Sequence, residues 1–134
     1  MDRSSSVEEL EADRWPAPPG DSTTLVRSVH ELRRRAIKDL SVEGLRRLIA
    51  QDVGLRWLLP VALEFLRDTA PQEAAAGWYD DDLLSAVLTR REPVWRNAPE
   101  LARHLDGTLR MLTDLSPYIQ REVDDFRTAL SDVL

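Results

Sequence analysis

The sequence contains no cysteine, and this absence excludes several kinds of chemistry. Without a thiol there is no disulfide, no thiolate nucleophile, and no zinc or iron–sulfur site built on cysteine ligands. The five glycines leave little material for phosphate-binding loops. Neither a glycine-rich nucleotide fingerprint nor a Gly-x-Ser-x-Gly turn occurs. We therefore expect no catalytic residue, no metal site and no cofactor.

Long apolar runs are missing as well. The longest, around residues 55–66, is interrupted by Arg56, Pro60 and Glu64, whereas a membrane-spanning helix takes about 20 apolar residues. The first fifteen residues carry acids where a signal peptide needs a basic start and an apolar core. We expect a cytoplasmic protein that does not contact a membrane.

The formal net charge is −6. This acidity disfavours nucleic acid, whose phosphates bind clustered Lys and Arg, and it favours a basic protein partner. It is equally typical of a domain that is simply kept soluble. The basic clusters Arg33–Arg35 and Arg46–Arg47 have Glu31, Asp39 and Glu43 near enough to pair with them. We interpret both clusters as solvated charged faces.

Apolar residues recur at spacings of three and four, which is the period of an amphipathic helix, and strand signals are nearly absent. The sequence therefore predicts an all-α fold, a compact bundle or a short helical-repeat-like stack of about seven helices. We expect one domain over residues 1–134. Residues 1–20 of this domain are expected to form a short helix and a proline-rich connector.

Polar residues indicate where helices begin. Ser6 and Glu9 have the spacing of a capping box, and either Asp21 or Ser22 is expected to cap the next helix. Ser41 is expected to cap a third helix, which ends at Gly54. The apolar stripes expected to face the core are Leu25, Val29, Leu32 and Ala36; Val42, Leu45, Leu48 and Ile49; and, near the C-terminus, Ile119, Val123, Phe126, Leu130 and Val133.

Prolines limit the remaining helices. Pro60 is expected in the first turn of a buried helix that runs to about Asp68, or at a kink, because proline inside a helix costs about 3 kcal/mol. Residues 71–77 are expected to form a second connector, and Pro93 to end a short helix. Pro99 and Pro117 are expected to start the last two helices.

One segment combines aromatic and acidic residues, Trp78 and Tyr79 followed by Asp80, Asp81 and Asp82. Aromatic anchors beside carboxylates are typical of protein-interface hot spots. Alternatively, one aspartate caps a helix, the others interact with its dipole and the aromatic rings pack underneath. The sequence leaves both interpretations open.

A second acidic patch, Glu122, Asp124 and Asp125, borders the apolar stripe of the last helix. We predict that the two segments together bind a protein partner, although a plain solvated face is the alternative for the second patch. The two histidines are given ordinary roles: His30 is expected to be solvated or half-buried, and His104 to pair with Glu100 four residues earlier.

Three stretches of this sequence resemble one group of contact-dependent growth inhibition (CDI) immunity proteins. The residues that carry the likeness are Leu10-Glu11, Asp13, Trp15, Leu25-Val26 and His30; Ser41-Val42-Glu43, Leu45-Arg46, Leu48-Ile49, Gln51, Val53-Gly54-Leu55, Leu59-Pro60 and Ala62-Leu63-Glu64; and Tyr79, Asp82-Leu83-Leu84, Ala86-Val87-Leu88 and Trp95. The likeness covers about residues 7–100. Asp52 stands where the family pattern has a glycine, and Asp80-Asp81 where it has Pro-Gly.

The resemblance implies a protein that binds and neutralises the toxin domain of a co-inherited secreted effector inside the producing cell. In this family the toxin is often a nuclease, and a nuclease is expected to be basic because it binds phosphates. The free protein is expected to be a monomer or a small homo-oligomer. The alternative is a helical adaptor or regulatory protein with no toxin partner.

Overall fold

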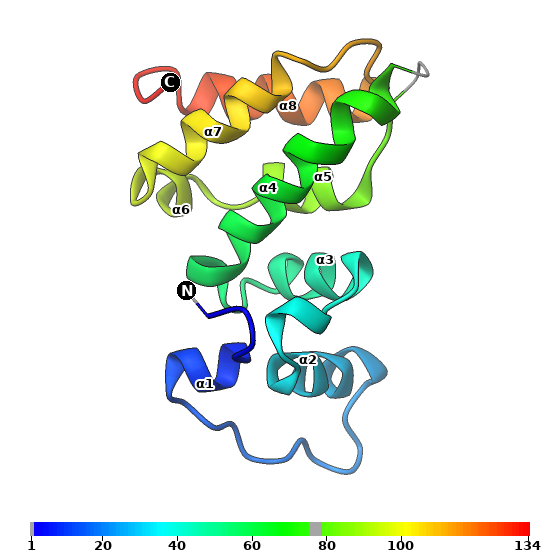
Figure 1. The fold of residues 1–134 in the computed structure, drawn as a ribbon, viewed down its shortest axis with the longest axis vertical. Helices are drawn as coiled ribbons and strands as arrows, with labels where there is room; N and C mark the ends of the chain where they lie inside the picture. Colours follow the sequence, from blue (N-terminus) through cyan, green and yellow to red (C-terminus); the bar gives the residue numbers. More distant parts are fainter. Residues whose placement is uncertain (1, 76–78) are drawn as a thin grey trace. The chain divides into compact units, whose positions relative to one another are not determined.

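The computed structural model describes residues 2–75 and 79–134. In these residues every regular element is helical, comprising eight α-helices and one short 3₁₀ helix (Figure 1). This confirms the predicted all-α class. The chain divides into two compact units, residues 1–58 and residues 59–134. The single domain expected from the sequence is not tested by this division and stays a prediction.

The first unit contains α1 (Val7–Glu11), α2 (Thr24–Arg34), the 3₁₀ helix η1 (Ile37–Asp39) and α3 (Val42–Ala50). Both α1 and α3 pack against α2. Their shared core consists of Val7, Val29, Leu32, Leu45, Leu48 and Ile49, all at least 92% buried. In contrast, Leu25 of the predicted stripe is 43% exposed, because it lies in the first turn of α2, at the edge of the core.

Side chains cap the helices of this unit. The capping box is confirmed: Ser6 Oγ accepts from the Glu9 amide at 3.1 Å, and the Ser6 amide donates to Glu9 Oε1 at 3.0 Å. The predicted cap of α2 is wrong, because Thr23 is the cap and accepts from the Val26 amide. Ser22 instead donates its amide to the Pro19 carbonyl, so it belongs to the last turn of the connector.

Gly54 does not end α3 as predicted. The helix ends at Ala50, and the left-handed residue that follows it is Asp52, with φ of 58°. Aspartate is one of the few residues other than glycine that tolerate this conformation. Gly54 also has positive φ, and it lies so close to Val7 that an added Cβ would meet the valine methyls at 2.8–2.9 Å.

The remaining helices are α4 (Leu55–Ala74), α5 (Asp82–Leu88), α6 (Glu92–Arg96), α7 (Pro99–Leu109) and α8 (Pro117–Ala129). Most of α4 and all the later helices belong to the second unit, where α5 packs against α8 and α6 against α7. The core of this unit includes Leu63, Leu66, Leu84, Trp95, Leu105, Ile119 and Val123. None of the described helices is both long enough and apolar enough to cross a bilayer.

Prolines are placed differently from the prediction. Pro60 and Pro71 both lie inside α4, so Pro60 is not in its first turn, and the alternative of a kink at Pro60 stays a prediction. Residues 71–74 are helical rather than a connector. The helix loses two backbone hydrogen bonds, but it buries Leu58, Leu63 and other apolar residues almost completely. Pro93 is in the first turn of α6, a helix that the sequence did not predict, where the missing N–H has no helical partner to lose.

Candidate protein-binding surface

The contact between α5 and α8 brings the two predicted acidic patches together within the second unit. Glu122 on α8 is close enough to Asp80 and Asp125 for the negative charges of both to raise its pKa. Asp82 lies three residues before Ser85, whose hydroxyl donates to Glu122 Oε2 at 2.9 Å, so Asp82 shares the helix face that meets α8. We call Asp80, Asp82, Glu122 and Asp125 the α5–α8 acidic surface.

Tyr79 and Asp81, which the sequence also placed at the interface, stabilise the local fold. Tyr79 is only 3% exposed, and its phenol donates to Asp81 Oδ2 at 2.7 Å. Asp81 Oδ1 accepts from the Leu84 amide and caps α5. The backbone of Tyr79 bonds to Asp114 and Ser116 in the segment before α8. Trp78, the other aromatic residue of the predicted site, lies outside the described residues.

Burial raises the pKa of the Tyr79 phenol above its ordinary value of 10.0. The hydrogen bond to Asp81 and the negative charges around the ring act in the same direction. Tyr79 therefore stays protonated and remains a hydrogen-bond donor at neutral pH. Its role is to fix the start of α5, and thereby to place the two neighbouring carboxylates, Asp80 and Asp82, at the surface.

A hydrogen-bond chain links α8 to α5. The Tyr118 phenol donates to Ser85 Oγ at 2.6 Å, and Ser85 Oγ donates to Glu122 Oε2. Glu122 Oε1 is buried and has no hydrogen-bond partner in residues 2–75 and 79–134. Burial raises the pKa of Glu122 above 4.5, the bond from Ser85 lowers it, and the charges of Asp80 and Asp125 raise it further.

Tyr118 is an exposed aromatic residue beside this acidic surface, and the sequence analysis did not select it. It is 44% exposed, and only its hydroxyl is held, by Ser85. On a helix, residues 118, 122 and 125 have the i, i+4, i+7 spacing of one face. That spacing was the available signal, and it joins Tyr118 to Glu122 and Asp125.

Asp124, in contrast, does not belong to the same face. Residues two positions apart on a helix are separated by about 200° of rotation, so Asp124 and Glu122 lie on nearly opposite sides of α8. Asp124 Oδ1 accepts a hydrogen bond from Gln120 Nε2 at 2.9 Å. The structure therefore brings four of the predicted acidic residues together and leaves Asp124 on another flank of the helix.

The exposed carboxylates of this surface are unpaired among the described residues. Within residues 2–75 and 79–134, the side chains of Asp80, Asp82 and Asp125 make no ion pair and no hydrogen bond. Asp106 is different: it is 6% exposed and pairs with Arg127 at 2.9 Å and Arg110 at 3.0 Å. The second unit thus supplies arginines to its buried carboxylate and none to these three exposed ones.

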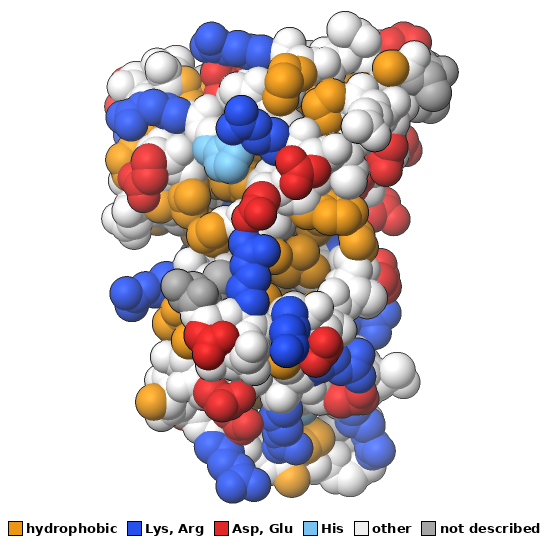
Figure 2. All heavy atoms as spheres, in the orientation of Figure 1, with side chains coloured by type: hydrophobic (Ala, Val, Ile, Leu, Met, Phe, Trp, Pro, Cys, Tyr) orange, Lys and Arg blue, Asp and Glu red, His pale blue; other side chains and the backbone are white. Residues whose placement is uncertain are grey.

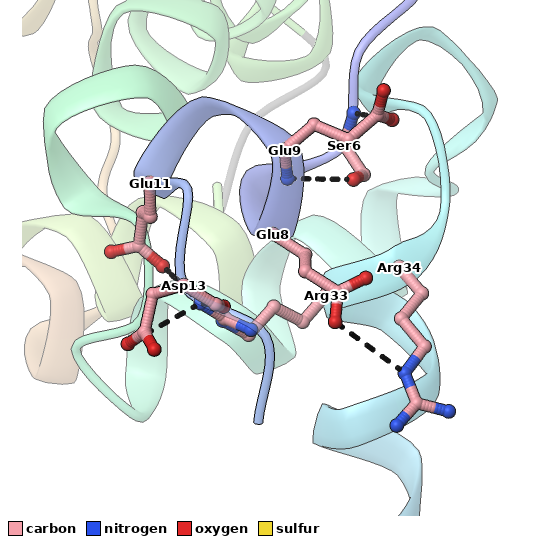
Figure 3. A network of polar contacts seen from close by, with 7 residues as sticks. All are labelled: Ser6, Glu8, Glu9, Glu11, Asp13, Arg33 and Arg34. Atoms are coloured by element: carbon pink, nitrogen blue, oxygen red, sulfur yellow. Dashed lines mark hydrogen bonds and ion pairs between the residues drawn. The ribbon is translucent and has the colours of Figure 1, made fainter. Parts of the chain in front are cut away.

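Arg33 corrects the prediction of a solvated basic face in the first unit. Its guanidinium is buried and donates to Glu11 Oε1 at 3.0 and 3.2 Å and to the Asp13 carbonyl (Figure 3). The Asp13 carboxylate lies 3.8 Å away, and the Trp15 ring centroid lies 4.2 Å from the guanidinium carbon. We call Arg33 with Glu11, Asp13 and Trp15 the Arg33 cluster. The physical reason for the burial is that Arg33 follows Val29 by four residues and so lies beside the core stripe.

The predicted charge pairs and histidine roles are partly present. Arg35 pairs with Glu31, and both Arg46 and Arg47 pair with Glu43, as expected for exposed helical neighbours. His30 is half-buried and meets the Trp15 ring edge-on at 5.1 Å. In the part of the chain that the structure describes, His104 forms no ion pair with Glu100, so that predicted pair is wrong. The described residues also contain no group of three or more potential metal ligands.

Comparison with known proteins identifies a family. A family model described as CDI immunity proteins matches residues 9–105, which is more than half of the chain. No curated protein and no solved structure matches. The matched range contains Asp80 and Asp82 of the α5–α8 acidic surface, whereas Tyr118, Glu122 and Asp125 lie beyond it.

Proposed function

Because this chain belongs to the family of CDI immunity proteins, we propose that it binds and neutralises the toxin domain of a contact-dependent growth inhibition effector. The toxin in this proposal is a basic nuclease, and the immunity protein acts in the cytoplasm by occluding the nuclease active site. The activity is binding, with no bond made or broken by this chain. The family match is the observation that carries the proposal.

We assign the toxin contact to the α5–α8 acidic surface and Tyr118. Asp80, Asp82 and Asp125 are exposed, and no cation within the described residues neutralises them. A nuclease cleft attracts phosphates, so it carries positive charge that these carboxylates match. Tyr118 adds an aromatic side chain of the type that dominates binding energy at protein interfaces.

The arrangement also supports fast and tight binding. Unpaired surface charge accelerates the encounter with an oppositely charged partner. The hydroxyl of Tyr118 is held by Ser85 and the start of α5 by the Tyr79–Asp81 bond, so little conformational freedom remains to be lost on binding. These contacts favour a surface that is formed before the toxin arrives.

A growth experiment tests the function itself. The toxin domain encoded beside this gene is expressed with and without the immunity protein, and growth and co-purification are measured. We expect co-expression to restore growth and to yield a stable complex. If toxin-expressing cells die equally fast with and without the immunity protein, and no complex is recovered, the proposal is wrong.

A kinetic experiment tests the binding surface. The triple variant Asp80→Asn, Asp82→Asn, Asp125→Asn is compared with the control Asp21→Asn, Asp39→Asn, Glu100→Gln, in which exposed carboxylates elsewhere are removed. Each variant removes three negative charges and changes the net charge from −6 to −3. We expect the first variant to associate with the toxin about tenfold more slowly at low salt, and the control to change much less.

The two variants separate local from overall charge. Equal slowing in both would mean that total charge alone steers association and that the contact lies elsewhere. Unchanged rates in the triple variant, together with full growth protection, would remove the α5–α8 acidic surface from the interface while leaving the immunity function intact.

A further inference from the structure

A basic cavity of about 280 Å³ lies in the second unit, between α4 and α7, and it is separate from the residues of the α5–α8 acidic surface. Its lining residues are Arg67, Arg103, His104, Gly107, Thr108 and Met111. None of them is acidic, although the protein as a whole carries a net charge of −6. Figure 2 shows basic side chains and a histidine over α7 and the adjoining part of α4, with acidic side chains beside them.

Most of the side-chain hydrogen-bond donors around this cavity have no partner among the described residues. Arg103 gives only its Nε to the Val133 carbonyl, at 3.2 Å. Within the described ranges 2–75 and 79–134, neither its terminal nitrogens nor the guanidinium of Arg67 makes an ion pair or hydrogen bond. His104 Nε2 is buried and also has no hydrogen-bond partner among those residues. Leaving a buried polar atom without a partner is unfavourable, and buried polar groups in native proteins are nearly always bonded.

Gly107 lines the cavity and lies inside α7. Glycine in the middle of a helix is less favourable than alanine, so a packing or functional reason is expected for it. Packing is not the reason here, because a Cβ built on Gly107 meets no atom within 4 Å. The space above the helix is therefore open, and Gly107 leaves it so between the guanidinium and imidazole side chains on either side of the cavity.

From these observations we propose that the α4–α7 cavity binds a small oxyanion, a phosphate or carboxylate group, between Arg67 and Arg103. Guanidinium groups bind both kinds of group through paired N–H donors. The volume of about 280 Å³ is just below the range of drug-sized sites, about 300–1,000 Å³, which suits a small anion. Met111 provides an apolar wall that suits a short carbon skeleton. The proposal is independent of toxin binding.

The NMR signals of the two histidine rings measure anion binding, with His104 as the reporter and His30 as the control. The protein is titrated at fixed pH and ionic strength with inorganic phosphate, with acetate, and with chloride as the reference anion, and the ring signals of His104 and His30 are followed by NMR. We expect phosphate or acetate to shift His104 along a saturable curve. His30 belongs to the first unit and should not respond.

Variants test the assignment to the cavity. Arg67→Gln and Arg103→Gln should each weaken the apparent affinity about tenfold, since each removes a charged donor. Gly107→Leu should abolish binding by filling the open space while the helix content stays unchanged. Arg121→Gln, an exposed arginine outside the cavity, is the matched control and should bind as the parent protein does.

Saturation by phosphate alone would identify the site as one for phosphate groups, and saturation by acetate alone as one for carboxylates. Both results support an oxyanion site. Shifts of His104 that grow linearly with all three anions would overturn the proposal, as would parent-like affinity in Arg67→Gln and Arg103→Gln or in a folded Gly107→Leu protein.

Discussion

The Arg33 cluster of the first unit and the α5–α8 acidic surface of the second use charge in different ways. Arg33 is 1% exposed, and its guanidinium is matched by Glu11, the Asp13 backbone and the Trp15 ring. Asp80, Asp82 and Asp125 are exposed, and no cation pairs with them in the described residues. A charge removed from water must be compensated where it is buried, whereas an exposed charge is already stabilised by solvent.

Asp106 shows that this difference is not one between the two units. It is buried in the second unit, and Arg110 and Arg127 pair with it there. Buried charges of both signs are therefore compensated within their own unit. The exposed carboxylates contribute little to folding and remain available to a partner, which is the basis for predicting opposite effects of mutation in the two regions.

The largest expected effect comes from removing the buried cation. Arg33→Met keeps much of the volume but leaves Glu11 without its partner and removes the cation–π contact with Trp15. Breaking a buried ion pair costs about 3–5 kcal/mol, and because Glu11 is partly exposed we expect about 2–3 kcal/mol. Urea denaturation followed by circular dichroism measures the change in the free energy of unfolding.

Arg34→Met is the matched control for Arg33→Met. Arg34 is the next residue of the same helix, but its side chain is 45% exposed and lies 3.9 Å from Glu8. Because Arg34 is largely solvated and the contact is long, we expect a loss of about 1 kcal/mol, smaller than for Arg33→Met, although Glu8 is only 19% exposed. Equal losses in the two variants would show that burial of Arg33 does not set its contribution, and the comparison between the two regions would fail.

The next effect concerns a tyrosine that the sequence placed at the interface. Tyr79→Phe removes the hydrogen bond to Asp81 and is expected to lower the free energy of unfolding by about 1–2 kcal/mol, because hydrogen bonds to charged groups are the stronger ones. The toxin affinity of the folded variant should fall only slightly, because Tyr79 helps to place Asp80 and Asp82 but is itself buried and does not contact the toxin. Denaturation and a binding assay on the same sample measure the two quantities.

Tyr118→Ala should give the opposite result. Tyr118 is exposed and its loss removes one hydrogen bond, to Ser85, so stability should fall by about 0.5–1 kcal/mol, whereas loss of an interface aromatic residue costs about 2 kcal/mol or more in binding. A weaker complex with Tyr79→Phe and a normal one with Tyr118→Ala would reverse our assignment of the two tyrosines.

The sequence predicted the elements whose signals are local. The capping box at Ser6 and the cap of α8 at Ser116 depend on residues three positions apart, and both are present in the structure. The stripe of α8 is likewise buried from Ile119 to Leu130. Such features need only the helical period and a side-chain acceptor, and both can be read from a single short segment.

Predictions failed where the outcome depends on partners that are distant in the sequence. Arg33 can be buried because Glu11 and Asp13, about 20 residues earlier in the chain, accept hydrogen bonds from its guanidinium. Pro60 is accepted inside α4 because burial of the helix compensates a local cost. The acidic surface required the contact between α5 and α8, which brings Asp80 to Glu122. None of these pairings follows from helical periodicity.

Glu122 is intermediate between the buried, paired charges and the exposed, unpaired ones, because it is an acidic residue that is only partly buried. Its pKa lies above 4.5, so over a pH range above that value the folded protein retains a proton that the unfolded chain has released. Stability therefore falls as the pH rises through this range. Glu122→Gln removes the effect and should gain stability relative to the parent protein at neutral pH, by less than about 1 kcal/mol because the side chain is partly solvated.

Thermal unfolding at several pH values between 4 and 8 measures this dependence. We expect the difference in stability between Glu122→Gln and the parent protein to grow with pH. Asp124→Asn is the control from the other flank of α8, and it should show no such growth. A constant difference across the whole range would mean that the proton on Glu122 is not linked to folding.

The smallest change in stability is expected from the α5–α8 acidic surface itself. The triple variant Asp80→Asn, Asp82→Asn, Asp125→Asn loses no hydrogen bond or ion pair within the described residues. It relieves repulsion around Glu122, so the free energy of unfolding should stay the same or rise by about 0.5 kcal/mol at most. Urea denaturation at low salt measures the change, since screening is weakest there.

This last variant separates folding from binding more clearly than the others, because the same substitutions are expected to slow association with the toxin. A carboxylate that serves the fold cannot be neutralised without a loss of stability, whereas one that serves a partner can. A loss of more than 1 kcal/mol in the triple variant would mean that these residues are structural, as Arg33 and Asp106 are. The division between matched and unmatched charge would then not correspond to a division between folding and recognition.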